Sequence, residues 1–126
     1  MKFRVPAFAL LALVALAHPK KTADVKVLET VARREANIIT VDGKVRIIGE
    51  KPLRGLVIVF DFRSPEREVI TAQKTTVDED TVERGHEGTY HVEMADAARA
   101  VTYTIRAFDT REKELSIENQ GPFPIE

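Results

Sequence analysis

The chain has 126 residues, no cysteine and a formal net charge of −1. Without cysteine it can form no disulfide, carry out no thiol catalysis and take no lipid through a lipobox cysteine. A chain with mixed charges and little net charge also lacks the basic field typical of nucleic-acid-binding proteins, so we expect no nucleic-acid partner.

The N-terminal residues have the pattern of a secretory signal peptide. Lys2 and Arg4 precede an apolar run over residues 7–17, which ends with the small residues Ala15 and Ala17 at the positions that a signal peptidase recognises. The run is shorter than the ~20 residues of a membrane span, although an uncleaved N-terminal anchor is the alternative. We therefore expect residues 1–17 to form a helical signal peptide that is cleaved after Ala17. The mature protein would be periplasmic or secreted, and it would meet the membrane only through the signal peptide before cleavage.

Alternating apolar and polar residues predict strands in the first half of the mature chain. Residues 24–32 suggest a first strand, with a short helix over residues 29–36 as the competitor. From residue 37 to 47 the alternation stays in phase, which indicates one long strand with Gly43 as a flat or bulged point. The alternative is a hairpin turn at Asp42 and Gly43. Residues 56–62 are apolar on both faces and predict a central strand, and residues 68–77 predict a polar, Thr-rich strand.

The second half of the mature chain continues this pattern after a polar loop over residues 78–88. Residues 89–94 predict a strand, and residues 96–100 predict one helical turn with Asp96 as its N-cap. A sixth strand should turn Val101, Tyr103, Ile105 and Ala107 inward, and a last strand should contain Leu115 and Ile117. Pro122 and Pro124 predict that residues 121–126 are an extended tail.

About seven short strands separated by turn signals predict an all-β fold. We expect an immunoglobulin-like, two-sheet antiparallel sandwich over residues 25–120, preceded by a flexible N-terminal segment at residues 18–24. Removal of the two basic residues of the signal peptide would leave 17 Lys and Arg against 20 Asp and Glu, a mature net charge of −3.

Residues 41–45 (VDGKV) are followed by a loop at residues 49–53 (GEKPL) and a strand at residues 57–61 (VIVFD), and residues 82–85 (VERG) precede Tyr90. Over about residues 38–109 this pattern resembles the FxLYD-type bacterial immunoglobulin-like domains, with residues 57–61 at their signature strand and residues 82–85 at the corner before a later strand. The resemblance implies a β-sandwich of an exported protein that acts as an accessory module without catalytic residues.

No catalytic motif accompanies this fold, so we expect neither an enzyme nor a cofactor. Two weak alternatives concern metals. If residues 89–94 form a strand, His91 and Glu93 share one face, and His86 could reach them from the loop with Glu87 beside it, which would suit zinc. The bland interpretation is a solvated strand face, and we favour it. The acidic residues 78–80 with Glu83 could hold calcium, but a solvated turn is the expected state.

We therefore expect an exported, non-enzymatic module that binds an unknown protein partner or serves as a structural accessory in the bacterial envelope. Its partner would meet a sheet edge, at residues 68–77 or 113–119, together with the 78–88 loop. Charged residues on those strands could instead protect the edges from pairing. The alternative function is a periplasmic metal- or small-ligand-binding protein that uses the His86–Glu93 region.

Overall fold

The computed structural model describes residues 23–126. These residues form eleven β-strands, and the part of the chain described here contains no helix that is long and apolar enough to cross a membrane. The predicted signal peptide, residues 1–17, lies outside the described residues, as does most of the predicted flexible segment 18–24.

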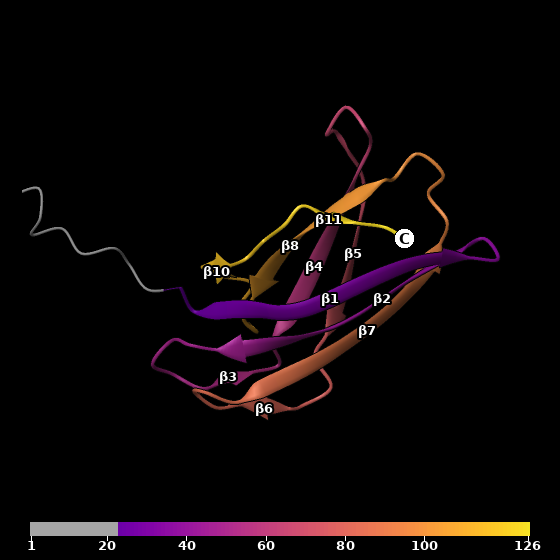
Figure 1. Cartoon of the computed structure of the whole chain (residues 1–126). Helices are drawn as coiled ribbons and strands as arrows, with labels where there is room; N and C mark the ends of the chain where they lie inside the picture. The colour runs from indigo at the N-terminus through magenta and orange to yellow at the C-terminus, as the bar shows by residue number, and fades with distance from the viewer. Residues whose placement is uncertain (1–22) are drawn as a thin grey trace, which may run out of the picture.

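The first sheet contains four strands in the order β10-β1-β2-β7 (Figure 1). Three of them are long and antiparallel to their neighbours: β1 (Val25–Glu35), β2 (Ile38–Ile47) and β7 (Glu87–Ala95). The fourth, β10 (Ile117–Glu118), pairs in parallel with the start of β1.

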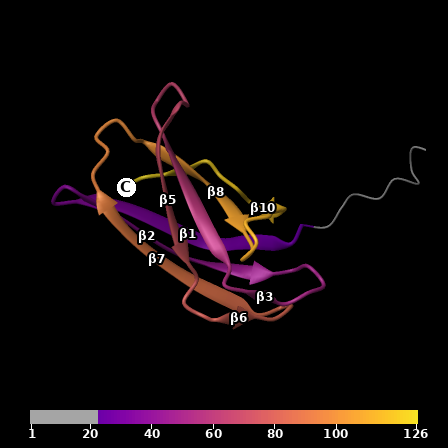
Figure 2. The ribbon, with the colours of Figure 1, turned by 180° about the vertical axis from the view of Figure 1, so that it is seen from behind.

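The second sheet has the strand order β11-β8-β4-β5, with β9 also paired to β8. Its strands are β4 (Val57–Arg63), β5 (Val69–Thr76), β8 (Thr102–Phe108), β9 (Glu114–Leu115) and β11 (Phe123–Pro124). The views from front and back both show β4, β5 and β8 crossing the long strands of the first sheet at an angle (Figures 1 and 2). A small third sheet pairs β3 (Leu53–Arg54) with β6 (Thr81–Val82).

The core lies between the two large sheets and is built from the apolar side chains that alternate along the strands. Ile58, Phe60 and Ile105 are fully buried, and the partly buried Val92 packs against the core to which they belong. The ring of Phe60 lies 5.3 Å from that of Tyr90 in the first sheet, measured between centroids. Side chains from both sheets therefore share one interior, and the predicted all-β sandwich of two packed sheets is confirmed.

The hairpin between β1 and β2 was not predicted. Its turn consists of Ala36 and Asn37, both with positive φ (52° and 67°), the backbone conformation of a two-residue type I′ turn. The helix considered over residues 29–36 is wrong, since β1 continues to Glu35. The single long strand through Gly43 is confirmed, but Gly43 is not bulged. The irregularity lies in β1 between Val27 and Glu29, and Gly43 is needed because the ring of Tyr90 lies over it.

Two predictions for the region around residue 100 are wrong. Residues 96–100 form a turn rather than a helical turn, closed by a hydrogen bond from the Ala100 amide to the Ala97 carbonyl. Asp96 does not cap a helix, because its carboxylate accepts a 2.7 Å hydrogen bond from Arg34 Nε instead. Val101 does not point inward: it precedes β8 and is 40% exposed, whereas the next three predicted positions of that strand are fully buried.

The predicted last strand is split. β9 pairs with β8 in the second sheet, and after Ser116 the chain changes sheets, so that β10 pairs with β1 in the first. The C-terminal tail likewise pairs first with the second sheet and then with the first. β11 pairs with β8, and the Glu126 amide donates to the carbonyl of Ala32 in β1 at 2.8 Å. The C-terminal segment, residues 114–126, thus joins the two sheets along the side of the sandwich formed by β1 and β8, and we call this the laced side.

Candidate functional site

The opposite side of the sandwich is formed by the edge strands β5 and β7, and we call it the open side. Within the described residues β5 pairs only with β4, and β7 pairs only with β2. The two edges meet where Thr75 Oγ1 donates to the carbonyl of His91 at 3.3 Å and the amide of Asp78 donates to the carbonyl of Thr89 at 2.8 Å. Along the rest of their length, β5 and β7 pair with no further strand of residues 23–126.

The hydrogen-bonding direction shows which backbone groups the open side presents. In β7, Thr89 and His91 turn their carbonyls away from β2. Because the direction alternates along a strand, the amide and carbonyl of Glu93 also face the open side. The amide of Val77, the residue after β5, donates to the carbonyl of Leu56, the residue before β4, at 3.0 Å. The alternate residues Ala72 and Lys74 therefore turn their backbone groups outward.

The side chains of β5 suit an accessible edge. Thr71, Gln73 and Thr75 alternate along the face turned toward β7 and are only partly buried, because this sheet edge is not closed over. At the start of β5, Val69 and Ile70 are 50% and 40% exposed. The expectation that residues 68–77 form a sheet edge is confirmed. Residues 113–119 also lie at sheet edges, because among the described residues β9 pairs only with β8 and β10 pairs only with β1.

His91 lies on the outer face of the first sheet in a cluster with Asp42 and Glu93. Its Nδ1 is 2.5 Å from Asp42 Oδ1, and its Nε2 is 3.5 Å from Glu93 Oε2. The hydrogen bond to Asp42 raises the pKa of His91, and the carboxylate of Glu93 adds to the shift. His91 and Glu93 were predicted to share a face. Asp42 was missed, because it joins them through the register of β2 with β7.

The other predicted metal ligands do not join this cluster. His86 precedes β7 and lies five residues from His91, which is about 17 Å along an extended strand. Glu87 forms an ion pair with Arg46 at 2.9 Å. Within residues 23–126 no group of three or more His, Asp or Glu side chains is arranged to hold a metal ion.

The acidic residues of the 78–88 loop hold the loop against β7. Glu79 Oε1 accepts a 2.8 Å hydrogen bond from the Thr89 amide, and Asp78 Oδ2 accepts one from the Thr89 hydroxyl at 3.1 Å. The bond from the Thr89 amide lowers the pKa of Glu79. These two carboxylates therefore act as local structural anchors of the loop.

The buried hydroxyl of Ser64 is occupied by the local backbone. Ser64 Oγ accepts hydrogen bonds from the amides of Glu66 and Glu68, at 3.2 and 3.3 Å. Among the described residues no hydrogen bond joins a serine to a histidine, so this part of the chain contains no Ser–His pair of the kind that activates a nucleophile.

Comparison with known proteins adds only the fold. No family model matches the chain, and no curated protein is significantly similar to it in sequence. Among solved structures, the C-terminal domain of Wzt is similar with a TM-score of 0.54 and 8% identity, over 85% of this chain and 76% of that one. Escherichia coli IrmA gives a TM-score of 0.46 at 12% identity, over 85% of this chain and 99% of that one.

Chains of two enzymes are also partly similar. A β-glucuronidase of Bacteroides uniformis matches with a TM-score of 0.44 and 10% identity, and 72% of this chain covers 12% of that one. The DNA glycosylase AlkC of Pseudomonas fluorescens matches with a TM-score of 0.44 and 13% identity, and 94% of this chain covers 37% of that one. At these TM-scores and identities the two similarities carry no statement about function. The resemblance to FxLYD-type domains stays a prediction.

Proposed function

We propose that this protein is an exported, non-enzymatic β-sandwich module of the bacterial envelope that binds a protein partner through its open side. The observation that carries the proposal is the difference between the two sides of the sandwich. The C-terminal segment joins the sheets on the laced side, whereas β5 and most of β7 keep unpaired backbone donors and acceptors on the open side. An extended segment of a partner can add to such an edge and satisfy these groups.

The charge of Lys74 restricts which strands can pair with β5. A lysine in the middle of an edge strand opposes uncontrolled association of sheet edges. Its charge also favours a partner strand with an acidic residue opposite it, since cross-strand pairs of opposite charge stabilise a sheet. The exposed Val69 and Ile70 supply apolar contact at one end of the same strand.

Site-specific photocrosslinking in the native envelope tests this proposal. A photoreactive residue at Ala72 in β5, or at Ala95 at the end of β7, should give one discrete protein adduct. The same residue at Glu118, on the laced side, is the matched control. Equal adducts from Glu118, or none from the open side, would refute the proposal.

The intact mass of the exported protein should lack residues 1–17, and a full-length mass would contradict cleavage.

A second candidate function is the binding of a metal or a small ligand at His91, although His91, Asp42 and Glu93 do not by themselves form a metal-holding group. A carboxylate that holds Nδ1 of a histidine leaves Nε2 directed at a ligand, and Glu93 lies on that side of the ring. Thermal unfolding with added zinc or calcium tests it. Stabilisation by a cation that disappears in His91→Ala would support this function over partner binding, and no shift with either cation would remove it.

A further inference from the structure

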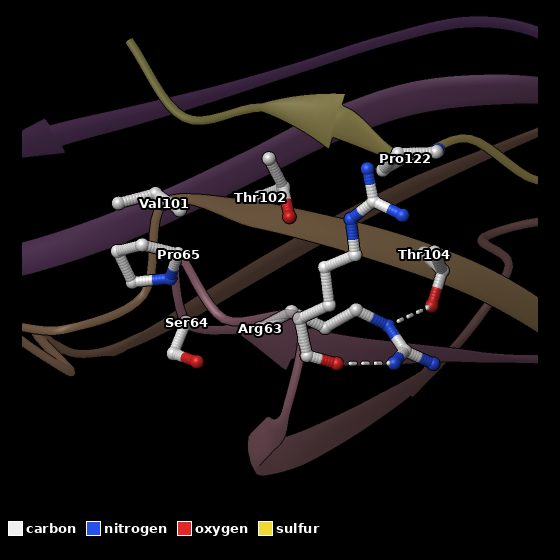
Figure 3. Close-up of a pocket in the computed structure, with 8 residues that line it drawn as sticks. Arg63, Ser64, Pro65, Val101, Thr102, Thr104 and Pro122 are labelled. Carbon is white, nitrogen blue, oxygen red and sulfur yellow. Dashed lines mark hydrogen bonds between the residues drawn. The ribbon is translucent and has the colours of Figure 1, made fainter.

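A groove with a volume of about 490 Å³ lies where β4 ends and the chain turns into β5 (Figure 3). None of its lining residues belongs to the edge strands β5 and β7. Its lining combines two arginines with hydroxyl groups and apolar walls. The residues that the argument uses are Arg63, Arg67, Thr102, Thr104, Val101 and Pro122.

Arg63 is held in place by neutral groups alone. Its Nε donates to Thr104 Oγ1 at 3.2 Å, and its Nη1 donates to the carbonyl of Arg67 at 3.0 Å (Figure 3). Each other arginine of the described chain that makes a side-chain hydrogen bond donates to a carboxylate. The guanidinium of Arg63 is therefore positioned without being neutralised, and its Nη2 has no partner within the described residues.

Arg67 is presented by a constrained loop. Its φ is +70°, a conformation uncommon for a residue with a side chain. The loop is fixed from inside by the buried Ser64, whose carbonyl accepts from the amide of Arg67 at 2.8 Å and whose hydroxyl accepts from two further amides. Such unusual backbone conformations persist where the surrounding structure fixes them, and they gather at binding sites. Within the described residues Arg67 forms no ion pair.

The neighbouring carboxylates are engaged elsewhere. Asp61 lies two residues before Arg63 on the same face of β4. Its carboxylate forms a bidentate pair with Arg106 at 2.7 and 2.9 Å. Glu66 pairs with Arg99 at 2.8 Å. No carboxylate lines the groove. A protein with a net charge of −1 thus contains a cationic groove whose charges no acidic lining residue cancels.

We propose that this groove binds a carboxylate-bearing ligand. A guanidinium presents two parallel N–H groups that match the two oxygens of a carboxylate. The hydroxyls of Thr102 and Thr104 can donate further hydrogen bonds, while Val101 and Pro122 provide apolar contact for the carbon skeleton. The carboxylate can belong to an acidic peptide or to a free small acid. The groove does not depend on the partner proposed for the open side.

NMR titration of the exported, ¹⁵N-labelled protein tests this site. The probes are sodium acetate, inorganic phosphate, a blocked hexapeptide of glutamate and the same peptide made of glutamine. Acetate and the glutamate peptide should shift the Nε–Hε signal of Arg63 and the amides of Thr102 and Thr104, whereas the glutamine peptide should not. Tighter binding of the glutamate peptide than of acetate identifies a peptide ligand, and equal binding identifies a free small acid.

Variants make the test specific. Arg67→Asn removes the charge with a residue that tolerates positive φ, and it should raise the Kd at least about tenfold. Arg67→Lys keeps the charge without the planar fork, so it should weaken binding even if Arg67→Asn fails to fold. The control is Arg33→Asn, an exposed arginine of β1, which should leave the Kd unchanged. No shift with acetate or the glutamate peptide, stronger binding of phosphate, or binding unaffected by both Arg67 variants would overturn the proposal.

Discussion

Replacement of Gly43 by alanine should destabilise the fold, because no space exists for a side chain at this position. Gly43 lies in the middle of β2, paired with Thr30 of β1 and Tyr90 of β7. A Cβ atom would overlap the ring and hydroxyl of Tyr90 and would lie 2.5 Å from the carbonyl oxygen of Glu29. The ring is buried in the core, and the carbonyl belongs to the backbone of β1. Neither can move away without displacing a strand.

The size of this effect follows from two opposing terms. Overpacking a filled interior costs about 1–3 kcal/mol, and a clash with both a buried ring and backbone belongs at the upper end of that range. Replacing glycine by alanine reduces the conformational entropy of the unfolded chain, which stabilises the fold by about 0.4–1 kcal/mol. The net loss in the free energy of unfolding should therefore be about 2 kcal/mol. For a domain of this size, that corresponds to a decrease in Tm of about 10 °C.

Urea unfolding followed by circular dichroism measures this loss, with Gly88→Ala as the matched control. Gly88 also lies within a strand of the first sheet, but its Cβ would meet only valine side-chain atoms, at 3.1 Å from Val82 Cγ2 and 3.4 Å from Val77. We expect its free energy of unfolding to change by less than about 1 kcal/mol. If Gly43→Ala unfolds at the same urea concentration as the wild type, the contact of Tyr90 with β2 is not as described here.

Three further predictions concern charged groups. Because the folded-state pKa of His91 is raised, its protonated form stabilises the fold below about pH 6.5, and this contribution is lost as the pH rises through the raised pKa. The variant Asp42→Asn should therefore lower the titration midpoint of His91 measured by NMR. Because the folded-state pKa of Glu79 is lowered, Glu79→Gln should decrease stability at pH 7, and the decrease should shrink as acid protonates the wild-type carboxylate. Arg106→Gln removes the charged partner of the buried Asp61 carboxylate and should cost about 2–3 kcal/mol in urea unfolding, the range of a hydrogen bond to a charged group.

Each of these predictions has an internal comparison. If the His91 midpoint in Asp42→Asn equals that of the wild type, the hydrogen bond from Asp42 is not the cause of the raised pKa. An unfolding difference for Glu79→Gln that stays constant with pH would exclude a role for its ionisation. Arg99→Gln breaks an exposed pair with Glu66 and should cost less than about 1 kcal/mol. Equal costs for Arg99→Gln and Arg106→Gln would contradict the importance of burial.

The candidate site was predictable only in part. The two-residue period of a strand placed His91 and Glu93 on one face, and the polar composition of residues 68–77 indicated an edge; the structure confirms both. Asp42 could not be found in the same way, because 49 residues separate it from His91 and only the pairing of β2 with β7 brings them together. The groove at Arg63 joins β4, β8 and the segment before β11, and no local motif links these segments.

The sequence by itself determined the class of the fold, because alternating apolar residues can be buried only by extended strands that turn one face to a shared interior. It also determined which side chains form that interior, such as Phe60 and Ile105. Only the tertiary structure decided how the C-terminal segment pairs with the two sheets. Residues 114–126 satisfy their backbone groups by alternating between β8 and β1, and that choice depends on the distance between two sheets rather than on any local preference. The same closure on one side leaves β5 and β7 exposed on the other.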